Sequence, residues 1–192
     1  LKKLLDESNL FLDWYLPKYI KGRKNRNLKI KFKSIFKKLL NSISYKNKVF
    51  VHRDFHISNI MITKKGLALI DNQDAVYGNI AYDLASLIDD VRLKTNIRTK
   101  NFIFDEFIKR NKSLNIQKFR NDFEILSVLR NLKIIGIFTR LSVRDKKNKY
   151  LKLIPYAWEL IDYRIHNNPI FKDLNYLLSE NFDKKIRKLY EN

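Results

Sequence analysis

The sequence predicts a mostly helical α+β fold that contains one small antiparallel β-hairpin. Two observations indicate this class. Apolar residues recur at helical spacing over most of the chain, whereas residues 49–71 show short β-type runs separated by a polar loop and a turn. The 192 residues, 45% of them hydrophobic, are enough to bury a sizeable core. We therefore expect one domain over 1–192, or one lobe of a larger enzyme.

Two helices are expected before the β-type stretch. The first covers 4–19, with Pro17 disturbing its end, and the second covers 28–43, where the apolar residues form one stripe. Aromatic residues at helical spacing in both helices indicate core packing. Residues 21–26 form the densest basic run outside the expected helices, contain no aromatic residue, and are interpreted as a solvated loop.

The β-type stretch consists of a strand at 49–52, a polar loop, and a hairpin of 59–63 and 67–71 around a turn at 64–66. If the pairing is centred near Lys65, Asn59 lies opposite Asp71, and directly opposed residues share a face. Their backbones would then be about 5 Å apart. Carboxylate and amide oxygens suit a hard, partly hydrated cation such as Mg²⁺. The sequence therefore predicts a metal site at Asn59 and Asp71.

Asp54 lies on the loop that feeds the hairpin, in the order His-Arg-Asp-(four residues)-Asn that begins at His52. In the kinase layout, the loop Asp accepts the proton of the acceptor hydroxyl. The Asn holds one Mg²⁺, and an Asp after the next strand holds Mg²⁺ that bridges the phosphates of ATP. These roles fall on Asp54, Asn59 and Asp71. The loop motif, the hairpin and the second Asp together predict phosphoryl transfer with ATP and Mg²⁺ as cofactors.

Three segments resemble the aminoglycoside phosphotransferase-like kinases, closest to the bacterial anomeric N-acetylmuramate/N-acetylglucosamine kinases of cell-wall recycling. They are FVHRDFHISNIMI (50–62), LIDNQDAVYGNIAYDLASLIDD (69–90) and LRNLKIIGIFTRLSVRDKKNKYL (129–151). Asn72 replaces the usual aromatic residue and Asn79 the usual proline, but neither change removes a catalytic oxygen. The resemblance implies a protein-kinase-like fold and ATP-dependent phosphorylation of a sugar hydroxyl.

A kinase of this type also needs an N-terminal lobe with a strand-borne Lys and a glycine-bearing loop over the phosphates. The sequence has four glycines, and none of them forms a Gly-rich phosphate cradle. We therefore expect residues 1–192 to correspond to the C-terminal lobe, which carries the catalytic loop and binds the acceptor. The N-terminal nucleotide-binding lobe is expected to be absent from this chain, and the isolated chain to be inactive.

Several residues near the motif receive supporting roles. The resemblance implies that Asp83 braces the catalytic loop, and its position at the start of an apolar helical stripe also fits an N-cap. His52 is interpreted as a second loop brace, and His56 as a sugar contact or a plain loop residue. Asp89 and Asp90 are expected inside the helix that follows Asp83. Asp90 is a candidate acceptor contact, with a solvated acidic face as the default interpretation.

The pattern further predicts a helix at 101–110 and a long, proline-free helix at 116–143. On a helical wheel the basic residues of the long helix form one stripe that includes Arg130 and Lys133. A solvated face and a site for phosphate or a substrate carboxylate both explain a stripe; the resemblance favours the site. Gly136 inside the helix costs about 1 kcal/mol relative to alanine, so we expect a close backbone approach there.

The motif and the resemblance imply a small-molecule sugar and a nucleotide as partners, and the composition argues against other classes of partner. Forty basic and 20 acidic residues give a net charge of +20, but the lysines are spread along the chain, which argues against nucleic acid. No apolar run approaches the roughly 18 residues of a membrane span, and no secretory leader is visible, so no membrane partner is expected. The absence of cysteine permits a cytoplasmic location. The oligomeric state is left open.

Two alternative functions compete with a sugar kinase. One is a kinase for another small alcohol, such as choline or an aminoglycoside, although a surface this basic would repel a polycationic aminoglycoside. The other is not enzymatic: a catalytically silent truncated lobe, or a basic binding module. Nucleic-acid binding by such a module would weaken steeply with salt.

Overall fold

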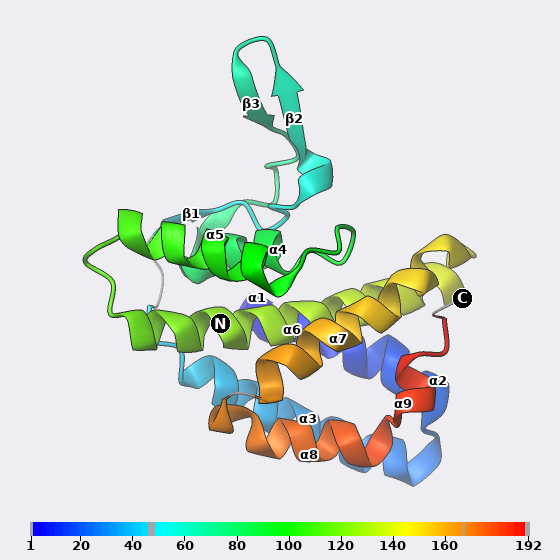
Figure 1. Cartoon of the computed structure of the whole chain (residues 1–192). Coiled ribbons are helices and arrows are strands. Elements are labelled where there is room, and N and C mark those ends of the chain that lie inside the picture. Colours follow the sequence, from blue (N-terminus) through cyan, green and yellow to red (C-terminus); the bar gives the residue numbers. More distant parts are fainter. Residues whose placement is uncertain (1, 46–48, 167, 191–192) are drawn as a thin grey trace. The chain divides into compact units, whose positions relative to one another are not determined.

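A computed structural model describes residues 2–45, 49–166 and 168–190 (Figure 1). This part of the chain is mostly helical and contains two pairs of antiparallel strands, which confirms the predicted fold class. It divides into two compact units: the helical unit, residues 1–42 with 128–192, and the loop unit, residues 43–127. Within the described ranges, no helix is both long and apolar enough to cross a lipid bilayer.

The helical unit contains nearly all of the long N- and C-terminal helices. Within this unit α3 packs against α1 and against α8, and Figure 1 shows α3 and α8 running side by side. The elements are α1 (Lys2–Leu10), a π-helical turn (Phe11–Tyr15), α2 (Leu16–Tyr19), α3 (Gly22–Asn41), the second part of α6 (Ile116–Val143), a 3₁₀ helix (Asn148–Leu153), α7 (Ile154–His166), a 3₁₀ turn (Pro169–Phe171), α8 (Lys172–Asn181) and α9 (Lys184–Arg187).

An aromatic cluster forms the core of the helical unit. The ring of Phe11 is fully buried, and its centroid lies 5.2 to 6.0 Å from those of Tyr15, Phe32, Trp158 and Phe182. The indole Nε1 of Trp158 donates to the Tyr15 hydroxyl at 3.2 Å. Burial raises the pKa of the Tyr15 phenol. The aromatic residues of the N-terminal helices are therefore packing residues, as their spacing predicted.

The second helix begins earlier than the apolar pattern predicts. It begins at Gly22 instead of residue 28, so the interpretation of residues 21–26 as a loop is wrong. Lys21 is extended and Gly22 adopts a φ of +60°, which sets the chain direction for the helix that follows. The side chains of this first part are largely exposed and polar, so no apolar periodicity marks it as helical.

Gly136 in α6 lies directly against the backbone of α1 and the turn that follows it. A Cβ atom at this position would stand 2.3 Å from the carbonyl carbon of Leu10 and 2.5 Å from the amide nitrogen of Phe11. These contacts are far shorter than any that side-chain carbons make. The predicted close backbone approach is confirmed, and it explains a glycine inside a 28-residue helix.

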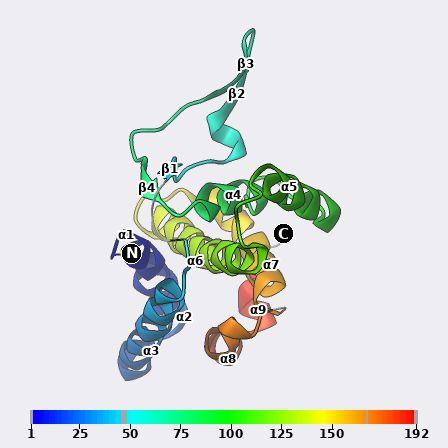
Figure 2. The same cartoon turned by 90° about the vertical axis from the view of Figure 1, so that its left-hand side faces the viewer.

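The loop unit contains all the strands of the described chain. Strands β1 (Val49–Val51) and β4 (Val76–Gly78) pair antiparallel, and β2 (Ile60–Thr63) pairs with β3 (Gly66–Leu69). Figure 2 shows the β2–β3 hairpin standing away from helices α4 (Ala81–Ile88) and α5 (Ile97–Arg110). The sequence did not predict β4, because a three-residue strand shows too little alternation to be recognised. Helix α5 begins before residue 101, since the Asn96 side chain caps it at the Thr99 amide.

The register of the β2–β3 hairpin differs from the predicted one. Thr63 lies opposite Gly66 and Ile60 opposite Leu69, so the turn contains two residues, not three. The Thr63 hydroxyl donates to the Gly66 carbonyl at 2.8 Å and accepts from the Lys65 amide at 3.2 Å. Gly66 adopts a φ of +112°, which favours glycine and closes the tighter turn.

The observed register also changes the residue that pairs with Asn59. Its carbonyl accepts from the amide of Ile70 at 3.1 Å, so the predicted pairing of Asn59 with Asp71 is wrong. Asp71 follows immediately and adopts a φ of +70°, in the left-handed region. A residue in this conformation leaves the alternation of a strand. The face on which the Asp71 side chain lies is therefore decided by this turn and not by strand register.

Candidate active site

Helix α4 holds the first part of residues 52–59, the predicted catalytic loop, through one carboxylate. Asp83 accepts from the backbone amide of His52 at 2.7 Å and from that of Arg53 at 3.0 Å, one at each oxygen. Asp83 lies in the first turn of α4 and is not its N-cap, so that interpretation is wrong. The amide of Ala81, the first helical residue, donates instead to the side-chain oxygen of Asn79 at 2.8 Å. The Asp83 carboxylate is thereby available to the loop.

Arg53 carries backbone strain at the centre of this loop. Its φ is +74°, and a residue other than glycine in the left-handed region costs about 1–3 kcal/mol unless its surroundings impose it. Here the Asp83 carboxylate binds the Arg53 amide, and the guanidinium donates to the carbonyl of Asp74 at 3.1 Å. The Asp74 carboxylate lies 3.8 Å from the same guanidinium. Arg53 therefore connects the catalytic loop to the loop after β3.

Asp54 has a fixed backbone and an uncommitted side chain. Its carbonyl accepts from the amide of His56 at 3.0 Å and from the side-chain Nδ2 of Asn59 at 2.9 Å. The side chain is half-buried, and its carboxylate makes no hydrogen bond or ion pair with any residue of the described ranges. Both carboxylate oxygens are thus available as acceptors for a ligand.

The Asn59 side chain is also oriented by this bond. Because Nδ2 is committed to the Asp54 carbonyl, Oδ1 lies on the opposite side of the amide, and the residue is buried with 8% of its surface exposed. Asp71 is exposed, and its Oδ1 accepts from Nε2 of Gln73 at 2.8 Å. The Asn59–Ile70 backbone bond places Asp71 one residue beyond the partner of Asn59.

One carboxylate and one amide oxygen form a donor set that suits a hard divalent cation. In the part of the chain that the structure describes, His, Cys, Asp and Glu side chains do not gather in groups of three that could hold a metal, at Asp71 or elsewhere. The oxygen types of Asn59 and Asp71 are ones that Mg²⁺ takes, and water or a ligand would have to supply the other oxygens.

The two histidines of the loop lie inside the loop unit. His52 is 1% exposed, and its Nε2 lies 3.0 Å from the carbonyl oxygen of Ile70. This contact ties the start of the catalytic loop to the end of the β2–β3 hairpin. His56 is also buried, with 8% of its surface exposed.

Asp89 and Asp90 do not lie on a solvated helical face, so the default interpretation of these residues is wrong. Helix α4 ends at Ile88, and both carboxylates are buried in the turn that follows. Asp89 forms a buried ion pair with Lys100 at 3.1 Å and accepts from the Ser127 hydroxyl at 2.6 Å. The default interpretation assumed that the helix continued past Ile88 and left both residues on a solvated face.

Asp90 contacts the catalytic loop. One carboxylate oxygen accepts from the backbone amide of Ile57 at 3.2 Å. The other accepts from the backbone amide of Arg92 at 3.0 Å and from its Nη1 at 3.2 Å. The predicted sugar contact is therefore a residue whose oxygens already accept hydrogen bonds from the protein.

The basic stripe of α6 is not an exposed face at its two candidate residues. Arg130 is 5% exposed, and the Lys133 ammonium lies 3.2 Å from the Glu7 carboxylate, with both side chains mostly buried. Farther along, Arg144 pairs with Asp145 at 2.7 Å. Helix α6 is buried around most of its circumference between Asp122 and Phe138, so a wheel diagram could not separate a solvated side from a packed one.

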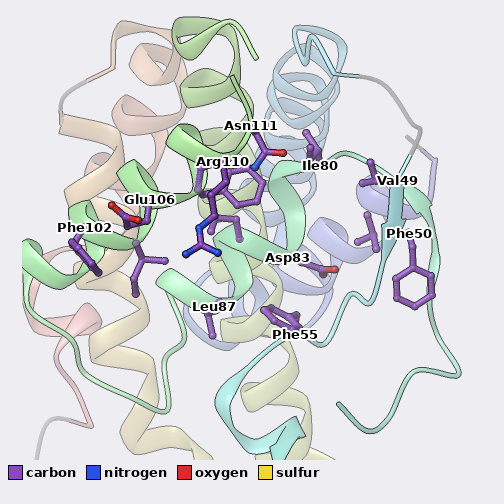
Figure 3. Close-up of a pocket in the computed structure, with 14 residues that line it drawn as sticks. Val49, Phe50, Phe55, Ile80, Asp83, Leu87, Phe102, Glu106, Arg110 and Asn111 are labelled. Carbon is purple, nitrogen blue, oxygen red and sulfur yellow. Dashed lines mark hydrogen bonds between the residues drawn. The ribbon is translucent and has the colours of Figure 1, made fainter. Parts of the chain in front are cut away.

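A cavity of about 700 Å³ lies between β1, α4 and α5 (Figure 3). Most of its lining is apolar, and Figure 3 shows Phe55 next to Asp83 on one side and Arg110 reaching over the cavity from α5. Phe55 follows Asp54 directly, so the cavity adjoins the catalytic loop. Sequence patterns gave no signal for it, because the lining residues come from separate elements that only the fold brings together.

The sequence around this site matches the profile of a known protein family. Residues 4–103 match the profile described as the phosphotransferase enzyme family, and these residues include the whole catalytic loop, the hairpin and α4. The matched region is more than half of the chain.

Curated relatives are similar over most of this chain. An N-acetylmuramate/N-acetylglucosamine kinase of Neisseria meningitidis is 36% identical over 165 residues, which are 79% of this chain and 47% of that protein. The proteins of the same name from Pseudomonas aeruginosa and Pseudomonas putida are each 28% identical, over 90% and 91% of this chain and 53% of their own lengths. The chain thus spans about half the length of the curated relatives it matches.

Proposed function

We propose, since this chain belongs to the phosphotransferase enzyme family, that it provides the catalytic loop of an ATP- and Mg²⁺-dependent sugar kinase. The proposed acceptor is N-acetylmuramate or N-acetylglucosamine, because the relatives described above are named as kinases of these sugars. That its anomeric hydroxyl is the one phosphorylated is what the sequence resemblance implies. The observation that carries the proposal is Asp54. Its backbone is held by the side chain of Asn59, while its carboxylate is left without a protein partner in the described ranges.

Asp54 would orient the acceptor hydroxyl and receive its proton as the hydroxyl oxygen bonds to the γ-phosphorus of ATP and the bond from that phosphorus to the departing ADP oxygen breaks. An anomeric hydroxyl belongs to a hemiacetal and is more acidic than an ordinary alcohol. Correct placement of the Asp54 carboxylate therefore contributes more than its basicity does. The hydrogen bonds of the loop supply that placement. The Asp83 carboxylate accepts from the amides of His52 and Arg53, and the His56 amide and the Asn59 side chain donate to the Asp54 carbonyl.

Asn59 and Asp71 would hold Mg²⁺ through Oδ1 of the amide and through the carboxylate. When bound, the ion neutralises negative charge on the phosphates of ATP. Asn59 would thereby have two tasks, since its Nδ2 fixes the Asp54 carbonyl and its oxygen would be a ligand of the ion. The proposed part in cytoplasmic recycling of cell-wall sugars rests on the sequence resemblance to those kinases.

We also propose that turnover requires a nucleotide-binding lobe with a strand-borne Lys and a loop over the phosphates. A coupled assay for sugar 1-phosphate tests the function directly. The 192 residues alone are expected to give almost no product, and the same chain joined to such a lobe is expected to turn over. Robust turnover by the 192 residues alone would contradict the need for the lobe. No product from either sugar with the joined protein would contradict the proposed function.

Replacement of Asp71 with Asn should lower turnover about 10²-fold or more, because charge stabilisation of the phosphoryl-transfer transition state is lost. The Mg²⁺ concentration needed for half-maximal activity should rise. Titration of Mg²⁺ at saturating ATP and sugar measures both effects. Asp105→Asn, an equal charge change at an exposed position on α5, is the matched control. An Asp71→Asn enzyme with the wild-type Mg²⁺ dependence would remove Asp71 from the metal site.

A further inference from the structure

We infer that Asp90 is a positioning residue of the catalytic loop and not a ligand of the acceptor sugar. It holds the second half of the loop by its backbone, as Asp83 holds the first half. The inference rests on the proposed function, because the role it assigns belongs to the same site.

The hydrogen bonds form a short path from Asp90 to Asp54. Asp90 accepts from the amide of Ile57, the first residue of the 3₁₀ turn Ile57–Asn59. The last residue of this turn, Asn59, donates its side-chain amide to the carbonyl of Asp54 at 2.9 Å. A shift of the turn would therefore move both the proposed metal ligand and the backbone of the proposed catalytic residue.

The two carboxylates act on either side of Asp54. Asp83, in the first turn of α4, binds the amides of His52 and Arg53, which precede Asp54. Asp90, just past the end of the same helix, binds the amide of Ile57, which follows it. Because helix α4 carries Asp83 and the turn directly after it carries Asp90, the two ends of the loop are held at a fixed separation. Asp54 lies between them.

The surroundings of Asp90 suit a structural anion. The side chain is 3% exposed, and a buried carboxylate is costly unless it is paired and hydrogen-bonded. Arg92 provides the opposite charge and two of the three hydrogen bonds. The neighbouring Asp89 ties the same turn to α5 through Lys100 and to α6 through Ser127. The turn that carries Asp90 is thus anchored independently of the catalytic loop.

The position of the Asp54 carboxylate matters for phosphoryl transfer. A displacement of a reacting group by about 1 Å can lower the rate about 10²-fold, because the reacting atoms must be nearly in contact and aligned. Loss of the Asp90–Ile57 bond should therefore lower turnover without weakening sugar binding. If Asp90 were instead a ligand of the sugar, its replacement would weaken sugar binding and leave turnover at saturating sugar unchanged.

The first test measures the contact without any activity. Amide hydrogen exchange of the 192-residue chain is followed by NMR in wild type, Asp90→Ala, Asp90→Asn and the control Asp105→Asn. The amide of Ile57 is expected to exchange at least about tenfold faster in Asp90→Ala, the scale for loss of a hydrogen bond to a charged acceptor. The amides of His52 and Arg53, held by Asp83, should change little, which separates a local effect from general unfolding. Unchanged exchange at Ile57 would overturn the inference.

The second test uses the chain joined to a nucleotide-binding lobe. Asp90→Ala is expected to lower kcat about 10- to 100-fold with KM for the sugar within about twofold of wild type. Asp90→Asn keeps the shape and an acceptor oxygen, so it should retain more of the turnover; it also provides a variant if Asp90→Ala does not fold. A raised KM with unchanged kcat would make Asp90 a sugar ligand and overturn the inference. If the wild-type protein phosphorylates neither sugar, the proposed function fails, and the exchange of the Ile57 amide still decides the contact.

Discussion

Replacement of Asp54 with Asn is expected to lower turnover by about 10² to 10⁴, the usual scale for loss of a general acid or base. The amide has nearly the same shape as the carboxylate, so the loop should keep its structure. The Asn amide cannot take the proton from the sugar hydroxyl. Its NH₂ group also stands where the carboxylate oxygen would accept a hydrogen bond from that hydroxyl. The affinity for nucleotide should change little, because Asp54 contributes to the acceptor side of the reaction.

The measurement is steady-state kinetics of sugar 1-phosphate formation by the chain joined to a nucleotide-binding lobe, together with nucleotide titration. Asp105→Asn provides the same change in charge at an exposed site on α5 and should behave as wild type. Near wild-type turnover by Asp54→Asn would show that the uncommitted carboxylate has another task. A large loss of nucleotide affinity would instead place Asp54 on the nucleotide side of the site.

Replacement of Gly136 with Ala is expected to lower the free energy of unfolding by about 3 kcal/mol or more, or to prevent folding of the helical unit. The added Cβ would stand 2.3 Å from the Leu10 carbonyl carbon and 2.4 Å from its oxygen, and backbone atoms cannot rotate away as a side chain does. In an exposed helix interior, Gly→Ala would instead raise the free energy of unfolding by about 1 kcal/mol. The sign of the measured change in this free energy therefore separates the two situations.

Urea denaturation followed by circular dichroism measures this effect on the 192-residue chain. Gln117→Ala, at an exposed position of the same helix, is the matched control and should change stability by less than about 0.5 kcal/mol. A Gly136→Ala chain as stable as wild type would mean that α1 and α6 do not approach each other as closely as described.

Much of the fold was predictable because its signals are short-range. The long helix was predicted at its observed bounds, since no proline or turn signal interrupts 116–143. The hairpin was recognisable from two short apolar runs around Lys64 and Lys65, although its register was not. The register depended on a hydroxyl of Thr63 that closes a two-residue turn, and apolar alternation tolerates a shift at such an exposed hairpin.

In the candidate site, too, the predictable features are those of residues close together in the sequence. The order His-Arg-Asp-(four residues)-Asn placed Asp54 and Asn59 in one loop, and the structure links them by a hydrogen bond. The partners of the more distant charged residues could not be predicted. Asp89 and Asp90 were expected on a solvated face and are buried, and Lys133 pairs with Glu7, more than a hundred residues earlier in the chain.

The sequence by itself therefore determined the helices, the presence of the hairpin and the loop that carries Asp54, because periodicity and motif spacing act over a few residues. For Asp83 the resemblance already implied a brace on that loop, and its carboxylate accepts from two loop amides. For Asp90 only the tertiary structure decided the contact, because the sequence left a sugar contact and a solvated face open. Both contacts form because folding brings α4 and the turn after it against the loop, where the two carboxylates accept from the backbone amides of His52, Arg53 and Ile57.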